Sequence, residues 1–168
     1  MSTPDVLLFA DRKVEGAYPV AEPSGAIVAR IQVPWTGTSF TATTGQGEPL
    51  CSGRRPHMFS QRWQAFDHAG RLVAELKPSF TGIRKTVTLG DGRVLELHGR
   101  MMSRDWRMDG PRGPVLSSEP TSSQWSFWPD AWQVRCHDVS LDLAQTVGIV
   151  ALNRIMVKAN RQSAGSAG

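Results

Sequence analysis

The stretch LDLAQTVGIVALNRIMVKANR, Leu141–Arg161, decides the fold of this 168-residue chain. Its apolar residues recur at helical spacing and cover most of the helix circumference, which leaves the polar residues in a narrow stripe. A helix that is apolar nearly all round must be buried in a protein core or in a bilayer. A spanning helix needs about 20 predominantly apolar residues, and Asp142, Asn153 and Arg154 interrupt this run. The sequence therefore predicts a helix over 141–161 that fills a protein core.

The core face of this helix is expected to consist of Leu143, Val147, Ile149, Val150, Leu152 and Ile155. Gly148 would let another element approach the helix closely. The polar residues Asp142, Gln145 and Asn153 would then need hydrogen-bond partners, because an unpaired buried polar group is destabilising. The small, polar tail 162–168 is expected to be disordered.

Five glycine-marked turns precede the helix. Their last glycines are Gly25, Gly47, Gly70, Gly92 and Gly113, and the steps between them are 22, 23, 22 and 21 residues. Glycine adopts the positive φ that tight hairpins need, and segments with strand-like alternation flank each turn. The best-defined hairpin joins Lys85–Leu89 to Arg93–His98.

These signals predict a mainly β fold, with about 10–12 antiparallel strands in a hairpin meander that closes into a barrel around the helix. A constant period is also typical of propellers and solenoids. The helix favours the barrel, because a helix that is apolar on all sides must pack against other residues on every side, and a closed sheet provides these contacts. A chain of this length fits one domain, so residues 1–161 are predicted to form a single barrel domain with its helix at 141–161.

Hairpins closed around one C-terminal apolar helix resemble the tubby-like C-terminal fold. The residues that carry the resemblance are Trp63–Ala74, Gly92–Gly99, Trp106–Met108, Trp132–Val134 and the helix Leu141–Arg161. The pattern is most similar to LURP-one-related and small bacterial tubby-like proteins, and the phospholipid scramblases share the plan. The resemblance implies a closed barrel and, in some members, binding of phosphoinositides. The cysteine-rich run and acidic calcium-binding segment of scramblases are absent here.

Positive charge is concentrated in the middle third of the chain. Residues 51–112 hold twelve basic and six acidic side chains, whereas residues 1–50 hold three and five and residues 113–168 hold four of each. Such a concentration favours an anionic partner on one face, such as phospholipid headgroups or nucleic acid. An ordinary solvated, arginine-rich surface would give the same composition.

The candidate anion-binding residues are Arg54, Arg55, His57, Arg84, Lys85 and Arg104. Arg54–His57 is a compact cationic loop, and arginine offers planar, bidentate donors that suit phosphate. The aromatic run Trp125–Pro129 would either reach a membrane interface or cap the barrel end.

No motif for catalysis, metal or cofactor binding stands out. Cys136 and His137 are adjacent, so they point to opposite faces of a strand, and no Cys/His spacing matches a zinc site. His98 and Glu96 share a strand face, but nothing supplies a nucleophile or an oxyanion hole. We therefore expect a non-enzymatic protein without a catalytic site, metal or cofactor.

Cysteine usage and the N-terminus favour a cytoplasmic protein. Cys51 and Cys136 lie far apart in the chain and are expected as reduced thiols, with a disulfide between them as the alternative. The apolar run Val6–Ala10 is too short for a secretory signal and follows no positive charge.

We expect a cytoplasmic binding module, peripheral at the membrane surface, that contacts anionic phospholipid headgroups through its arginine-rich face. The alternative is a protein-interaction or scaffold domain. Nucleic acid is not favoured, because the aromatic residues do not interleave with the basic ones in a stacking pattern. No transmembrane segment is expected.

Overall fold

The computed structural model describes residues 3–78, 85–99, 105–121 and 131–165, and it contains twelve strands and one helix in these ranges. The strands are β1 (Val6–Ala10), β2 (Tyr18–Ala21), β3 (Ile27–Gln32), β4 (Ser39–Thr44), β5 (Pro49–Arg54), β6 (Trp63–Asp67), β7 (Leu72–Pro78), β8 (Lys85–Leu89), β9 (Val94–Gly99), β10 (Trp106–Gly110), β11 (Gly113–Pro120) and β12 (Ala131–Cys136). The helix is α1 (Leu143–Gly165).

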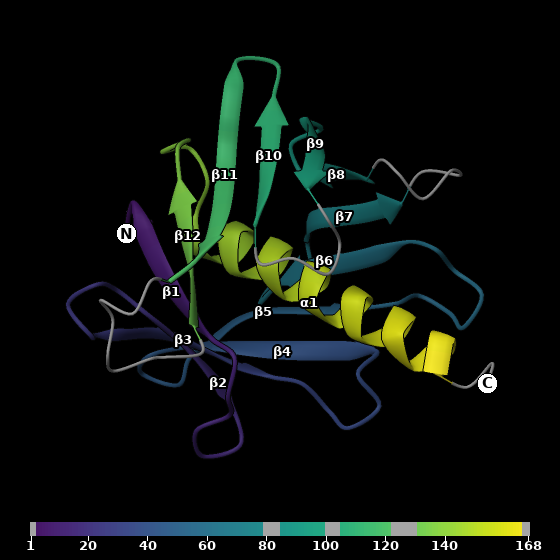
Figure 1. The fold of residues 1–168 in the computed structure, drawn as a ribbon, viewed down its shortest axis with the longest axis horizontal. Coiled ribbons are helices and arrows are strands. Elements are labelled where there is room, and N and C mark those ends of the chain that lie inside the picture. The colour runs from purple at the N-terminus through teal and green to yellow at the C-terminus, as the bar shows by residue number, and fades with distance from the viewer. Residues whose placement is uncertain (1–2, 79–84, 100–104, 122–130, 166–168) are drawn as a thin grey trace.

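The strands form one closed antiparallel barrel, as the sequence predicted (Figure 1). Each strand pairs with its neighbours in the chain, and β1 closes the barrel by pairing with both β2 and β12. The closing register places Leu8 opposite Gln133 and Phe9 opposite Trp132. Because the sheet closes on itself, none of the twelve strands in the described ranges presents an unpaired edge to another chain.

The 22-residue period of the sequence is the length of one hairpin with its connection to the next. In the first four turns the glycine has a φ between 77° and 93° (Gly25, Gly47, Gly70 and Gly92). The amide of each donates to the carbonyl three residues earlier, as Gly47 N does to Thr44 O at 3.0 Å and Gly92 N to Leu89 O at 2.9 Å. Glycine accommodates this left-handed conformation without steric cost. We call the end of the barrel that carries these hairpin turns the tight-turn end.

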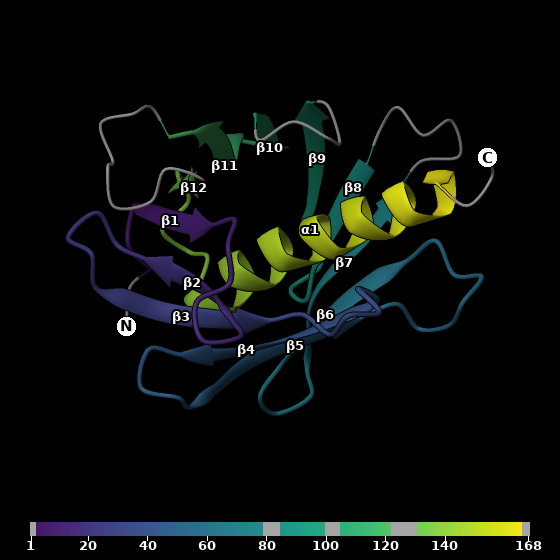
Figure 2. The same cartoon turned by 60° about the horizontal axis from the view of Figure 1, so that its bottom comes forward.

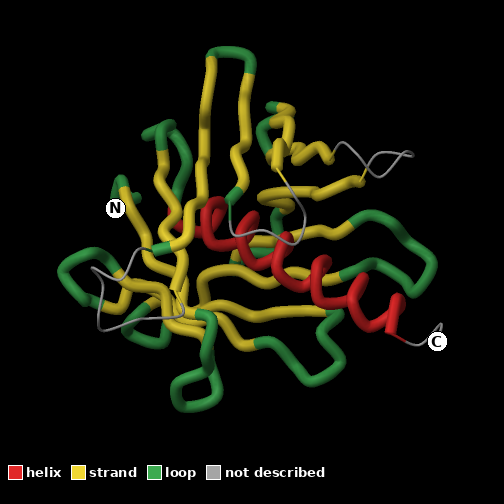
Figure 3. The backbone as a smooth tube through the Cα atoms, viewed as in Figure 1, coloured by secondary structure: helices red, strands yellow, loops and turns green. Residues whose placement is uncertain are grey.

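The connections between successive hairpins lie at the opposite end of the strands, because the strand direction alternates along the meander. Three of these connections fall in the described residues: 11–17 between β1 and β2, 33–38 between β3 and β4, and 55–62 between β5 and β6. They are longer than the hairpin turns, and the last two extend beside the C-terminal half of α1 (Figure 3). We call this end of the barrel the long-loop end.

Helix α1 runs through the barrel and fills its interior (Figure 2). Val147, Ile149, Val150, Leu152 and Ile155 are all at most 2% exposed, which confirms the predicted core face. Leu143 is only partly buried, although it packs against the same core. Gly148 provides the close approach that its size predicted, because an added Cβ would lie 3.3 Å from the Cβ of Ala65 on β6.

The helix begins and ends later than predicted. It starts at Leu143 rather than at residue 141, because Asp142 is its N-cap: Gln145 N donates to Asp142 Oδ1 at 2.7 Å, and Asp142 N donates to Gln145 Oε1 at 3.0 Å. At the other end the prediction of a disordered tail is wrong for residues 162–165, which continue the helix to Gly165. Residues 166–168 lie outside the described part of the chain.

The polar stripe of the helix is only partly paired. Asp142 and Gln145 satisfy each other at the N-cap. Thr146 and Asn153 are buried, and within the described residues Thr146 Oγ1 and Asn153 Oδ1 have no hydrogen-bond partner. The expectation of internal partners therefore fails at Asn153.

Candidate functional site

The predicted anion-binding residues separate into three groups. Arg54, the last residue of β5, is exposed, Arg55 is half-buried at the start of the 55–62 loop, and His57 is exposed in that loop. All three lie at the long-loop end. Lys85 lies inside the barrel instead, and Arg84 and Arg104 fall outside the described residues.

Aromatic rings support the guanidinium groups of Arg54 and Arg55. Arg54 Cζ lies 5.9 Å from the ring centroid of Phe66, and Arg55 Cζ lies 5.5 Å from that of Trp63. Arg55 Nε also donates to the carbonyl of Ser60. Within the described residues no carboxylate lies at ion-pair distance from either arginine. Both guanidinium groups are thus held in place by ring faces, which leaves most of their donors for an outside acceptor.

Two arginines at the tight-turn end are paired with carboxylates. Arg71 pairs with Asp67 at 2.8 Å, and Arg93 contacts Asp91 at 2.7 Å and Asp138 at 2.8 Å. The pKa of Asp91 is lowered, first by the backbone N–H of Arg93 and then by its side chain. These arginines stabilise turns. Arg71 and Arg93 are therefore paired at the tight-turn end, whereas Arg54 and Arg55 at the long-loop end have no carboxylate partner among the described residues.

Three further segments lie beside the cationic loop 54–57 at the long-loop end. Arg55 N donates to Thr38 O at 3.2 Å, which ties the 55–62 loop to the 33–38 loop. Lys13 Nζ donates to Val33 O at 3.1 Å and so links the 11–17 loop to the same place. At Gly37 an added Cβ would lie 3.1 Å from Lys158 Cδ, so the C-terminal half of α1 packs beside the 33–38 loop. The long-loop end thus gathers lysine side chains in addition to the predicted arginines.

Three large apolar side chains on these loops were not predicted as functional residues. Trp35 is 88% exposed on the 33–38 loop, and Met58 and Phe59 are 75% and 87% exposed on the 55–62 loop. A signal was present in the sequence, since both loops contain a proline and large apolar residues without any strand or helix period. The aromatic run Trp125–Pro129, which the sequence singled out instead, lies outside the described residues.

Lys85 does not belong to this surface, which corrects its assignment as a headgroup contact. It alternates with Val87 and Leu89 on the inward face of β8 and is 4% exposed. Among the described residues its Nζ has no hydrogen-bond partner. Burial lowers the pKa of the Lys85 ammonium from 10.5 to about 8.

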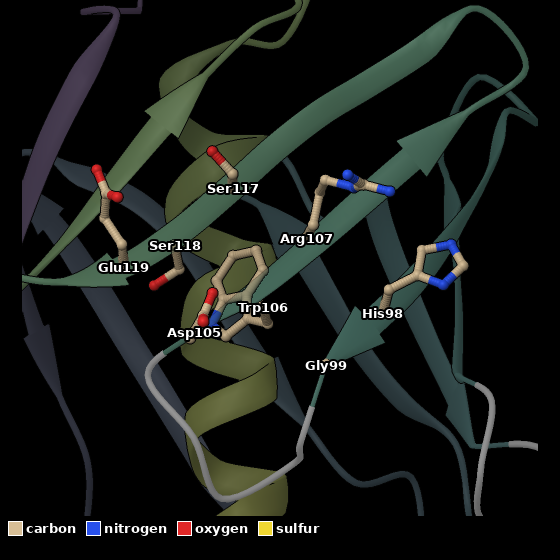
Figure 4. A pocket seen from close by; sticks show the side chains of 8 residues that line it. All are labelled: His98, Gly99, Asp105, Trp106, Arg107, Ser117, Ser118 and Glu119. Atoms are coloured by element: carbon tan, nitrogen blue, oxygen red, sulfur yellow. The ribbon is translucent and has the colours of Figure 1, made fainter.

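A hollow of about 520 Å³ lies over β9, β10 and β11, lined by His98, Gly99, Asp105, Trp106, Arg107, Ser117, Ser118 and Glu119 (Figure 4). Its polar groups are engaged with their own neighbours. Arg107 contacts Asp109 Oδ2 through both Nε at 3.1 Å and Nη2 at 2.9 Å. Ser117 Oγ lies 2.8 Å from His137 Nε2, and Gln133 Nε2 donates to Glu119 at 3.1 Å.

The hollow does not assemble a recognisable catalytic or metal site. His98 Nε2 lies 3.6 Å from Asp109 and 3.8 Å from Glu96, as their shared face predicted. Ser117 and His137 form a hydroxyl–imidazole pair, but in the part of the chain that the structure describes no carboxylate lies at ion-pair distance from His137 to complete a catalytic triad. Within the described residues no three His, Cys, Asp or Glu side chains are grouped as metal ligands. The long-loop end is therefore the better candidate for function.

Both cysteines are free thiols, so the alternative of a disulfide does not apply in this structure. Cys51 is buried against α1, and burial followed by the charge of Asp142 raises its pKa to about 12. Burial also raises the pKa of Cys136, which is half-buried. Neither thiol is a reactive thiolate at neutral pH.

Helical structure in the described residues lacks the length and apolarity that crossing a bilayer would require. No family model matches the chain, and no curated protein matches it. Among solved structures, it is similar to the X-ray structure of a protein from Arabidopsis thaliana, with a TM-score of 0.63 and 17% sequence identity. The match covers 95% of this chain and 94% of that chain. At this identity the likeness is one of fold, and it extends over the whole barrel and its helix.

Proposed function

We propose that this protein is a non-enzymatic binding module that attaches to anionic phospholipid surfaces through the cationic side chains of its long-loop end. The central contacts are Arg54 and Arg55, with His57 beside them. The observation that carries the proposal is the state of the two arginines, which rest on the rings of Phe66 and Trp63 without a carboxylate partner among the described residues. This surface is compatible with a cytoplasmic protein that is peripheral at the membrane.

The chemistry of the site suits phosphate groups. Guanidinium donors bind phosphate oxygens in pairs, and stacking on a ring fixes the plane of the donors before the ligand arrives. The supporting charges come from several loops, which fits an extended anionic surface better than a single small anion. Basic residues near an anionic membrane contribute about 1 kcal/mol each to binding.

Vesicle binding tests the proposal directly. The protein would be mixed with vesicles of phosphatidylcholine alone or with phosphatidylserine, and the bound fraction measured by flotation at low and high salt. We expect binding only with phosphatidylserine, and weaker binding as salt screens the charges. The double variant Arg54→Gln/Arg55→Gln should lower the partition coefficient by about 30-fold, from about 2 kcal/mol at tenfold per 1.4 kcal/mol.

A variant at the other end of the barrel provides the matched control. Arg71→Gln/Arg112→Gln removes the same charge from two exposed residues of hairpin turns at the tight-turn end. It should bind like the unchanged protein, and thermal unfolding would verify that both variants fold. An equal loss of vesicle binding in both variants would show that the net charge of the protein, and not the position of the arginines, determines binding. An absence of binding at low salt would overturn the proposal and favour a protein partner.

A further inference from the structure

We propose that Trp35, Met58 and Phe59 form an apolar tip that enters the interfacial region of the bilayer when the long-loop end meets an anionic membrane. This inference rests on the proposed function and adds depth of insertion and orientation to it. The arginines would hold the headgroups, and the tip would reach below them toward the acyl chains.

Among the described residues, no other part of the chain covers these three side chains. The barrel and α1 bury the large apolar side chains of the core at 0–8% exposure, including Phe9, Phe40 and Trp63. The other exposed apolar side chains in the described ranges are the smaller aliphatic ones of Val14, Leu72, Val94 and Val139, at 38–89%. Trp35, Met58 and Phe59 instead stand at 75–88% exposure. Exposed apolar groups that lie together mark contact surfaces, because their hydration is unfavourable.

The three side chains lie on adjacent loops. The strands that carry the loops pair directly, with Ser39 at the start of β4 opposite Arg54 at the end of β5. The backbone hydrogen bond from Arg55 N to Thr38 O continues this pairing into the loops themselves. Figure 2 shows the ends of β4 and β5 side by side below the helix.

Each loop presents its apolar residues at the apex of a hydrogen-bonded turn. Gly37 N donates to Pro34 O at 3.0 Å, so Trp35 is a central residue of that turn. Ser60 N donates to His57 O at 2.9 Å, which makes Met58 and Phe59 the central residues of the second turn. Pre-formed turns lower the entropic cost of ordering the tip on binding.

The basic residues of the two loops favour an anionic membrane over an apolar protein surface as the partner. The segments 33–38 and 55–62 contain Arg55, His57 and Arg62 and no acidic residue. Arg62 Nη1 lies 3.8 Å from Glu75 Oε1, and about half of the Arg62 side chain stays exposed to solvent. Tryptophan and phenylalanine on loops that also carry basic residues suit the bilayer interface, where apolar acyl chains lie directly beneath anionic headgroups.

A fluorescent probe at position 59 tests insertion. The variant Phe59→Cys would be labelled with an environment-sensitive nitrobenzoxadiazole maleimide, with the unsubstituted protein as the control for labelling of Cys51 and Cys136. These native thiols are shielded, because one is buried and the other half-buried, with raised pKa values. The variant Arg112→Cys, labelled in the hairpin turn at the opposite end, provides the positional control.

On vesicles of phosphatidylcholine and phosphatidylserine, the label at position 59 should shift to the blue and be quenched by lipids with a spin label in the upper acyl chain. The label at position 112 should do neither. Flotation without a shift or quenching at position 59 would overturn insertion and leave headgroup binding intact. Failure to float would overturn both proposals.

A second variant separates insertion from charge. Trp35→Ser/Met58→Ser/Phe59→Ser keeps every basic residue and changes only exposed side chains, so the barrel should remain folded. We expect it to bind at low salt but to lose about tenfold or more of its binding at physiological salt, where apolar contact supports the unchanged protein. Equal salt sensitivity in the triple variant and the unchanged protein would contradict the inference.

Discussion

Replacement of the buried Lys85 by methionine should stabilise the protein at neutral pH. Lys85 is 4% exposed, and its buried Nζ lacks a hydrogen-bond partner among the described residues, so burial of the ammonium opposes folding while it is charged. Burial lowers its pKa from 10.5 to about 8. At 1.36 kcal/mol per pKa unit, this difference corresponds to about 3 kcal/mol of lost stability.

The pH dependence of this effect has a definite sign. Below pH 8 the lysine is protonated in both the folded and the unfolded state, and the full penalty applies. Between about 8 and 10.5 the unfolded chain binds the proton and the folded chain does not, so the stability of the unchanged protein rises with pH. Above 10.5 the penalty is gone.

Urea unfolding of the unchanged protein and Lys85→Met at several pH values from 7 to about 10.5 would measure this. We expect the variant to be more stable by up to about 3 kcal/mol at pH 7, with a difference that shrinks toward the alkaline end. The exposed Lys77→Met on β7 is the control and should change stability by less than about 0.5 kcal/mol at every pH. A difference that does not vary with pH would refute the reasoning, because it would show that the charge has an adequate partner.

Two further substitutions test the packing of the barrel and its helix. Gly53→Ala should lower the free energy of unfolding by about 1–3 kcal/mol, because the added Cβ would collide with the buried ring of Phe40 and lie 3.0 Å from Leu152 Cδ2; a neutral result in thermal unfolding would mean that the ring moves aside. Asp142→Ala should cost about 1 kcal/mol through loss of the N-cap bond from Gln145 N, and urea unfolding would detect it. Asp142→Asn keeps the acceptor and should retain most of that stability, so an equal loss in both variants would exclude the cap as the cause.

Local patterns predicted most of the architecture. The glycine turns predicted the hairpins because positive φ is a property of single residues, and the barrel followed from a helix whose apolar surface needs a wall all round. The short β1 and β2 carried too little alternation to stand out as individual strands. The helix continued beyond residue 161 because its N-cap and core packing fix its start and middle, while the small residues of the tail remain compatible with helical structure.

The candidate site was less predictable, because its members meet only through the fold. The register of β4 and β5 joins the base of the loop that carries Trp35 to the base of the loop that carries Met58 and Phe59, and no local pattern encodes that register. The support of Arg55 by Trp63 depends in the same way on the pairing of β5 with β6. For Lys85 the sequence did indicate burial, since this residue alternates with Val87 and Leu89 on one strand face. Lysine is usually exposed, however, and the prediction followed that general tendency.

The closing pair of the barrel has a consequence for how the chain folds. Val6 pairs with Arg135, and Thr3 Oγ1 donates to the carbonyl of Leu141 at 2.6 Å, so β1 finds its second partner, β12, only after nearly the whole barrel has been synthesised. The helix that supplies the core comes later still. Contacts of such long sequence separation slow folding. A ribosome-bound chain that ends before residue 131 therefore lacks both β12 and α1, and the barrel becomes a stable unit only once the residues of α1 have been synthesised.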